Sequence, residues 1–248
     1  YTLHITRSPY LTLTSVKDAD GADIALVDGT YYVPEDCASI SVVADSYKTD
    51  LTINGQAAVS GKASVVAPVW SEGDSFTITL CASIGETTYA VELPMKKLTA
   101  ADEFSGSCGT GATWTLKNGV LTISGSGAMA DYTSVSMAPW AGFKSVIKSA
   151  VVQEGITGIG NYAFFKLPDL TSASLPASLK SIGSHAFEGC GKLSEATLPE
   201  GLTHLGYESF KATALTSVVL PVSLETLESL AFNALGALNG ELPINEYK

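Results

Sequence analysis

The chain has 248 residues, a formal net charge of −11 at pH 7 and an apolar share of 46%. This length suffices for about two domains and this apolar share for packed cores. The acidic balance has no basic cluster to offset it, which argues against binding to nucleic acid or to anionic membrane surfaces. No run of about 18 apolar residues is present, so we expect no membrane-spanning segment.

Residues 1–7 alternate apolar and polar side chains, as a strand does. They begin with Tyr1 rather than Met, which favours a mature or shortened chain over a cytoplasmic start. Two interpretations stay open for this segment. It is either the last strand of a preceding domain or an edge strand of the domain that follows.

Residues 8–98 are predicted to form an all-β sandwich. Short runs rich in Val, Ile and Thr alternate with turn signals such as Asn54-Gly55 at a spacing of about ten residues, which is typical of a sandwich. The clearest predicted strands are Ser39–Ala44, Asp50–Ile53, Ala63–Ala67, Ser75–Cys81 and Thr88–Leu93. The segment VWSEGDSFTITLCASIGETTYAVEL (69–93) resembles the closing strands of the cadherin-like domains of bacterial surface proteins. This resemblance implies an Ig-like fold.

Residues 99–146 are predicted to be a linker and a capping hairpin. The stretch 98–107 is expected to be the linker, and Asn118-Gly119 between two alternating runs is a strong signal for a type I′ hairpin. An open end of a repeat array exposes an apolar cross-section and an unpaired strand edge. We therefore expect the hairpin, through Trp114 and with Trp140 beside it, to cover the first repeat.

Residues 147–248 are predicted to be a repeat domain, in which a 23-residue pattern occurs four times, starting at 147, 170, 193 and 215. Phe164, Phe187, Phe210 and Phe232 mark the same position in each copy, and such a period indicates a solenoid. The other shared apolar positions are Ile147, Leu170, Leu193 and Leu215; Val152, Leu175, Leu198 and Leu220; Ile156, Leu179, Leu202 and Leu224; and Ile159, Ile182, Leu205 and Leu227.

Within a copy the apolar period changes from that of a strand to that of a helix. The run 215–220 alternates like a strand, and the Pro that follows ends it. Leu179, Ile182 and Phe187 then lie on one helical stripe. Each copy is therefore predicted to be a strand, a corner and a short helix. Stacked copies would form a short α/β solenoid with a parallel sheet on one wall and helices on the other.

The segment LTSASLPASLKSIGSHAFEGCGKL (170–193) is very similar to the BspA-like, or type 5, leucine-rich repeat of bacterial surface proteins. The lead-in from Cys108 to Met129 also resembles the segment that precedes repeats in this family. Two departures occur: the copy with Phe210 is one residue shorter, and Glu228 replaces a recurring Gly, which we interpret as fraying toward the C-terminus. The resemblance implies an extracellular interaction module of a bacterial cell-surface protein, not an enzyme.

No residue set in the sequence indicates catalysis, and we expect no cofactor and no metal. The four Cys residues, Cys37, Cys81, Cys108 and Cys190, have no metal-ligand spacing, so structural thiols are favoured, with a Cys37–Cys81 disulfide left open. His4, His185 and His204 give no reason to expect convergence. Asp18-Ala-Asp-Gly-Ala-Asp23 lacks the long ligand run of a calcium loop, which favours a hairpin turn.

The predicted binding face is the outward face of the parallel sheet, which we call the strand wall. Four rungs about 4.8 Å apart, with strands of about five residues, give an area on the order of 300 Å². A standard interface covers roughly 800 Å² per partner, so we expect weak or multivalent binding. The candidate partner-binding residues are Ser149, Val151, Ser172, Ser174, Glu195, Thr197, Ser217 and Val219.

The sequence thus predicts a multidomain chain in which an all-β Ig-like sandwich precedes a leucine-rich-repeat solenoid with a hairpin cap. The favoured function is secreted, non-enzymatic adhesion to a protein or glycan on a host or neighbouring cell. One alternative is a structural stalk that spaces another domain from the envelope. Another is carbohydrate binding by sandwich aromatics, for which the candidates are Tyr31, Tyr32, Trp70 and Tyr89.

Overall fold

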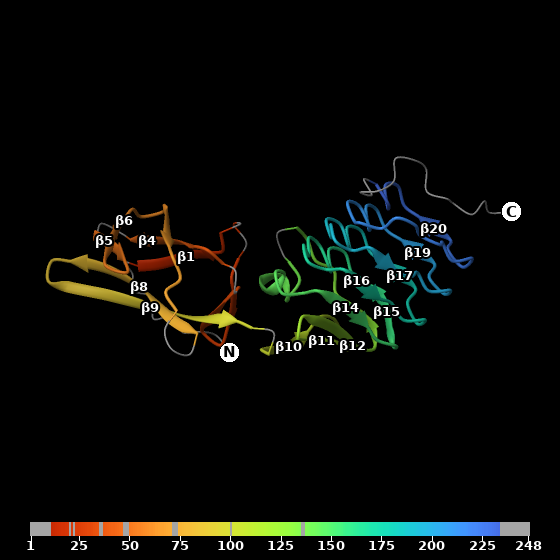
Figure 1. Cartoon of the computed structure of the whole chain (residues 1–248), viewed down its shortest axis with the longest axis horizontal. Helices are drawn as coiled ribbons and strands as arrows, with labels where there is room; N and C mark the ends of the chain where they lie inside the picture. Colours follow the sequence, from red (N-terminus) through yellow and green to blue (C-terminus); the bar gives the residue numbers. More distant parts are fainter. Residues whose placement is uncertain are drawn as a thin grey trace. The chain divides into compact units, whose positions relative to one another are not determined.

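The computed structural model describes residues 11–233 except 20, 22, 35–36, 47–49, 71–73, 100 and 135–136. The chain forms two compact units, residues 1–99 and 100–248, shown in Figure 1. The expected terminal strand 1–7 and the polar C-terminal stretch 239–248 lie outside the described residues. Within the described part of the chain, no helix has the length and apolar character needed to cross a bilayer.

The N-terminal unit consists of two β-sheets whose pairs are antiparallel except for β3 with β9. The first sheet has the order β1 (Leu11–Lys17), β4 (Ile40–Ser46), β7 (Ala63–Val66). The second has the order β2 (Ala25–Val27), β3 (Thr30–Pro34), β9 (Thr87–Leu98), β8 (Ser75–Ile84), β5 (Asp50–Ile53), β6 (Gln56–Ala58). All five clearest predicted strands are confirmed, whereas β1, β2, β3 and β6 were not named from the sequence.

The two sheets of the N-terminal unit bury one common core. Val42 of β4 and Leu80 of β8 are fully buried within the same apolar cluster, although they belong to different sheets. Side chains alternate along each strand, so every second residue of β4 contributes to this core. The Asn54-Gly55 turn between β5 and β6 has both residues at positive φ, as a type I′ turn requires. The all-β expectation for this unit is confirmed.

The C-terminal unit is built from two sheets that run along the repeat array. The first has the order β10 (Glu103–Ser107), β11 (Ala112–Lys117), β12 (Val120–Gly125), β14 (Ser149–Val152), β16 (Ser172–Ser174), β18 (Glu195–Ala196). The second has the order β13 (Gly127–Ala128), β15 (Ile156–Ile159), β17 (Ser181–Ile182), β19 (His204–Leu205), β20 (Thr226–Leu227). Strands β10 to β12 pair antiparallel, and the pairs from β12 onward are parallel.

The predicted helix after each corner is wrong. The described residues contain no α-helix, and their helical structure is limited to one 3-10 turn, η1 (Ala141–Phe143). Residues 161–166, 184–189, 207–212 and 229–233 are turns instead, and we call their stack the turn wall. In this wall Tyr162, His185, Glu208 and Leu230 occupy the same repeat position, all with φ between 53° and 62°. A left-handed residue at each copy prevents a continuous α-helix.

Backbone hydrogen bonds of the turn wall run between copies rather than along one helix. The amides of Phe164, Phe187 and Phe210 donate to the carbonyls of Ala186, Ser209 and Ala231, respectively. In each case the donor belongs to one copy and the acceptor to the next copy along the chain. The helical spacing of apolar residues therefore indicates which side chains face the core. It does not indicate the backbone hydrogen bonds, whose acceptors lie in the neighbouring copy.

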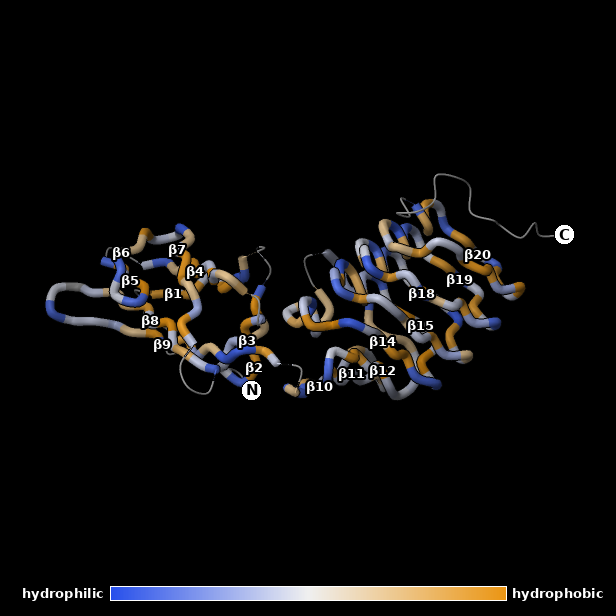
Figure 2. Tube along the Cα trace, viewed as in Figure 1, coloured by the Kyte–Doolittle hydropathy of each residue, from blue (hydrophilic) through white to orange (hydrophobic). Residues whose placement is uncertain are grey.

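The four repeated Phe side chains form a ladder through the core. Phe164 and Phe187 stack with ring centroids 4.8 Å apart, and Phe187 and Phe210 with centroids 4.9 Å apart. Trp140 stacks on Phe164 at 5.9 Å and so begins the ladder on the cap side. Figure 2 shows the apolar residues of each copy recurring along the array. Phe164, Phe187 and Phe210 are thus core, as the repeat pattern predicts, whereas Phe232 in the last copy is half-buried.

The recurring Gly residues are needed because adjacent copies approach closely. A Cβ atom at Gly160 would lie 1.9 Å from the Ala130 carbonyl oxygen, and one at Gly183 would lie 2.6 Å from Asn161 Oδ1. Glu228 occupies this position in the last copy, and its Oε2 accepts a hydrogen bond from the Tyr207 amide at 2.8 Å. Glu228 is therefore an ordered backbone cap, so our interpretation of fraying at this residue is wrong.

Two further predicted features differ from the structure. Part of the expected linker, 103–107, is strand β10, because it pairs with β11 from Glu103↔Lys117 to Ser107↔Thr113. The expected strand at 215–220 does not form. The first strands of successive copies shorten from four residues in β14 to three in β16 and two in β18. Backbone pairing in the first sheet therefore ends before the last copy.

Candidate functional site

The strand wall brings five of the eight predicted partner-binding residues onto paired strands. Ser149 of β14 pairs with Ser172 of β16, which pairs with Glu195 of β18. Val151 and Ser174 form the neighbouring row, and Thr197 directly follows β18. The side chains between these residues, such as Ala150 and Ala173, are buried. The structure therefore turns the predicted residues outward, where they are exposed or half-buried.

The predicted residues of the last copy lie beyond the paired wall. Ser217 and Val219 are exposed, but the segment that carries them forms no strand. Val219 is 70% exposed. These two side chains therefore extend the wall without the backbone pairing that fixes the other rows.

The cap enlarges the strand wall, which sequence reasoning missed. Lys117, Val120 and Ser149 are successive partners in one row, and Thr115, Thr122 and Val151 are partners in the next. The hydroxyls of Thr113 and Ser124 also share a hydrogen bond of 3.1 Å. Six strands at about 4.8 Å give a face on the order of 450 Å², still well below the roughly 800 Å² per partner of a standard interface.

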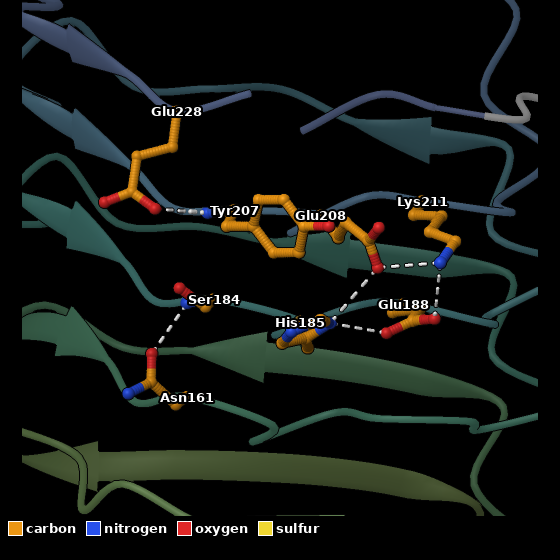
Figure 3. A network of polar contacts seen from close by, with 8 residues as sticks. All are labelled: Asn161, Ser184, His185, Glu188, Tyr207, Glu208, Lys211 and Glu228. Atoms are coloured by element: carbon orange, nitrogen blue, oxygen red, sulfur yellow. Dashed lines mark hydrogen bonds and ion pairs between the residues drawn. The ribbon is translucent and has the colours of Figure 1, made fainter. Parts of the chain in front are cut away.

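A second polar feature lies on the turn wall and is shown in Figure 3. His185 Nδ1 lies 2.6 Å from Glu188 Oε2 and 3.5 Å from Glu208 Oε2. Lys211 Nζ lies 2.7 Å from Glu208 Oε2 and 3.3 Å from Glu188 Oε1. The His185 ring stacks on Tyr162 at 4.5 Å and meets Tyr207 edge-on at 5.4 Å. We call His185, Glu188, Glu208 and Lys211 the His185 network.

Charge pairing sets the electrostatics of this network. The hydrogen bond from Lys211 lowers the pKa of Glu208, and the same contact with Glu208 raises the pKa of Lys211. The hydrogen bond to Glu208 raises the pKa of Tyr207. The Glu208 carboxylate and the Lys211 ammonium are therefore both charged at neutral pH. His185 Nδ1, a Glu188 oxygen and a Glu208 oxygen lie within 4.8 Å of one another, so this set has the donor atoms for a metal ion.

The repeat spacing contains a signal for the network that sequence reasoning did not use. His185 and Glu208 are separated by one period of 23 residues, and so are Glu188 and Lys211. Residues one period apart are stacked neighbours in a solenoid. Asp169 and Lys192 have the same separation and also form an ion pair. Opposite charges at the repeat period therefore identify inter-copy contacts.

The other candidates from the sequence do not assemble into sites. Tyr31 pairs with Met95, six residues along β9 from Tyr89, so the two Tyr residues are about 20 Å apart along the sheet. Tyr31 is buried, and Trp70 packs edge-on against Phe76. The aromatic platform proposed for carbohydrate binding is thus not formed.

Cysteine, histidine and aspartate candidates also stay apart. Cys37, Cys81, Cys108 and Cys190 are thiols, so the Cys37–Cys81 disulfide is not formed. His204 lies on β19 and contacts Glu228 at 3.5 Å, whereas His185 lies on the turn wall. His4 lies outside the described residues. Asp23 pairs with Lys17 at 2.8 Å, as expected of a turn.

Residues 140–240 match the family model described as the BspA type leucine rich repeat region, six copies. These residues are BspA-type leucine-rich repeats. The match begins at Trp140, the residue that starts the aromatic ladder, and it covers the turn wall and the His185 network. The BspA-type array therefore includes the repeats predicted from the sequence.

Solved structures of leucine-rich repeat proteins are similar to part of this chain. A protein from Eubacterium ventriosum is 26% identical, with a TM-score of 0.43 over 51% of this chain and 40% of its own. The T. pallidum leucine rich repeat protein is 24% identical, with a TM-score of 0.36 over 47% and 60%. A leucine rich cell surface protein from Faecalibacterium prausnitzii is 17% identical, with a TM-score of 0.27 over 54% and 53%. The chain thus spans less than two thirds of each. No curated protein matches it.

Proposed function

We propose that this chain is a non-enzymatic interaction module of a bacterial extracellular protein. The observation that carries the proposal is the match of residues 140–240 to BspA-type leucine-rich repeats, a repeat that the sequence resemblance associates with bacterial surface proteins. The proposed partner is a protein or glycan on a host or neighbouring cell. The N-terminal unit is proposed to be an Ig-like domain, supported by two sheets that share one core.

The strand wall is the proposed binding face. It is a regular surface of mostly Ser and Thr side chains held by paired backbone, with Ser172 and Ser174 on β16, between β14 and β18. Its area is about half that of a standard interface, and its described residues include no aromatic anchor. A single copy should therefore bind weakly, and several copies on one cell surface should bind strongly through avidity.

The test is binding of the chain displayed as a biotinylated tetramer to matrix proteins, glycans and bacterial or host cells. Ser172→Arg places a bulky charge between Ser149 and Glu195 on the strand wall and should abolish the binding. Thr157→Arg is the matched control, because Thr157 is exposed on β15 of the other sheet. Equal loss in both variants would place the binding elsewhere. Absence of binding to every surface would favour the stalk interpretation instead.

A further inference from the structure

The His185 network has the donor geometry of a transition-metal site. Zinc binds imidazole nitrogen at about 2.0–2.1 Å and carboxylate oxygen at about 2.0–2.2 Å, so two tetrahedral ligands lie about 3.3 Å apart. His185 Nδ1 and Glu208 Oε2 are 3.5 Å apart, close to that separation. Glu188 Oε2 is hydrogen-bonded to the same nitrogen at 2.6 Å and would need to move by less than about 1 Å.

The charges of the network also leave room for a divalent cation. Two carboxylates face one ammonium, so the set carries one net negative charge when His185 is neutral. The Glu208 side chain is only 9% exposed, which makes an uncompensated charge costly there. A divalent ion in place of the Lys211 ammonium would balance both carboxylates.

Lys211 is the group that can leave. Its side chain is 30% exposed, compared with 17% for Glu188 and 9% for Glu208. A lysine ammonium sits on a flexible four-carbon stem and is readily hydrated. The ligands are less free, because the His185 ring is held between Tyr162 and Tyr207. The network thus has a fixed imidazole and a movable cation.

We propose that His185 Nδ1, Glu188 and Glu208 bind a divalent transition-metal ion of the Zn²⁺ type. An imidazole with two carboxylates suits zinc and its neighbours better than calcium, which prefers oxygen ligands alone. The three ligands come from two successive copies, so the ion ties these copies together.

The experiment is calorimetric titration of the chelator-treated full chain with ZnCl₂ at pH 7.5, with thermal unfolding measured at each step. We expect one Zn²⁺ per chain and a higher unfolding temperature in its presence. His185→Gln and Glu208→Gln should each weaken binding at least about tenfold. Lys211→Met removes the competing cation and should strengthen binding about tenfold. Circular dichroism of each metal-free variant establishes that it is folded.

His204→Gln is the matched control, because His204 also contacts a carboxylate, Glu228, but no second one within the described residues. Its zinc affinity should be unchanged. A Co²⁺ titration excludes the thiols, because thiolate coordination adds an intense near-ultraviolet band that nitrogen and oxygen ligands do not give. Equal weakening in His204→Gln, a thiolate band, or no zinc binding by either the unmodified chain or Lys211→Met would overturn the proposal. If His185→Gln fails to fold, the gain in Lys211→Met decides.

Discussion

The buried position before the recurring Phe is Ala in three copies and Ser in one. Ala163, Ala186 and Ala231 fill this position in three copies, and Ser209 fills it in the remaining copy. Ser209 is fully buried, and its hydroxyl has no hydrogen-bond partner among the described residues. A buried polar group without a partner costs about 1–3 kcal/mol. The Ser209 hydroxyl therefore lowers the stability of the copy that contains Phe210.

We expect Ser209→Ala to increase the free energy of unfolding of the repeat unit by about 1 kcal/mol. The measurement is denaturant unfolding followed by circular dichroism. Ser178→Ala is the matched control, because the Ser178 hydroxyl donates to the Ile156 carbonyl at 2.8 Å and accepts from the Gly155 amide at 3.0 Å. The control should lose stability. A loss in Ser209→Ala as well would mean that its hydroxyl does have a partner.

At the scale of the element, the Glu154 carboxylate fixes the corner between the two strands of the second copy by capping backbone amides. Glu154 accepts hydrogen bonds from the amides of Ala177 and Ser178 in the next copy, at 2.8 Å and 3.2 Å. These contacts, first that with Ala177, lower the pKa of Glu154 from its ordinary value of about 4.5. A carboxyl with a lowered pKa stabilises the fold above its ordinary pKa, and that contribution is lost as the pH falls through the lowered value.

Glu154→Gln should therefore lower the thermal midpoint at pH 7, and the difference from the unmodified chain should shrink below about pH 4. Thermal unfolding at pH 7, 5, 4 and 3 measures this dependence. Glu195→Gln serves as control, because Glu195 is exposed on β18 and its carboxylate makes no hydrogen bond within the described part of the chain. A constant difference at every pH would show that charge on Glu154 is not what stabilises the corner.

The repeat period identifies the buried positions of a copy but not its backbone conformation. The recurring Phe and Leu positions were predicted as core because each copy repeats them. Phe187 and Leu179 are indeed fully buried, but Leu227 in the last copy is 45% exposed. The helix was mispredicted because an inward stripe at helical spacing also fits a series of turns. The left-handed residues that separate the two cases are Tyr162, His185 and Glu208, and of these residue types only His is enriched in this conformation. Backbone pairing between copies decided the outcome.

At the scale of the whole repeat unit, the cap completes the hydrogen bonds of the first copy. Trp140 Nε1 donates to the Ala163 carbonyl at 2.9 Å, and the Tyr132 amide donates to the Asn161 carbonyl at 2.9 Å. Both acceptors belong to the turn wall. The sequence predicted Trp140 at the cap because of its apolar surface. In the structure its indole N–H also takes the place of the backbone donor that a preceding copy would supply.

Trp140→Phe keeps the aromatic packing but leaves the Ala163 carbonyl without its donor, so we expect a loss of about 1–3 kcal/mol in unfolding free energy. Trp114→Phe is the matched control, because the buried Trp114 Nε1 has no hydrogen-bond partner in the described residues. Chemical denaturation of both variants measures the difference. A cost for Trp114→Phe as large as that for Trp140→Phe would assign both effects to ring packing instead.

Some properties of the whole unit follow from the sequence and others do not. The period locates the array, and Asn118-Gly119 locates the hairpin, since both residues have the positive φ of a type I′ turn. The continuation of the hairpin into the repeat sheet through β12 and β14 depends on pairing at long range, which no local pattern reports. For the same reason the strand wall is larger than predicted, and the His185 network was missed.

The turn wall finally gives the array a direction. Its inter-copy bonds, as in Tyr162 to Ser184, His185 to Tyr207 and Ala212 to Asn233, all point donors toward the C-terminal end. The peptide dipoles therefore add along the stack, as they do in an α-helix, with a negative pole at the cap and a positive pole at the far end. Two identical ends would oppose donor to donor or acceptor to acceptor. A further copy can therefore extend this wall only head to tail, with its acceptors against the donors of the existing wall.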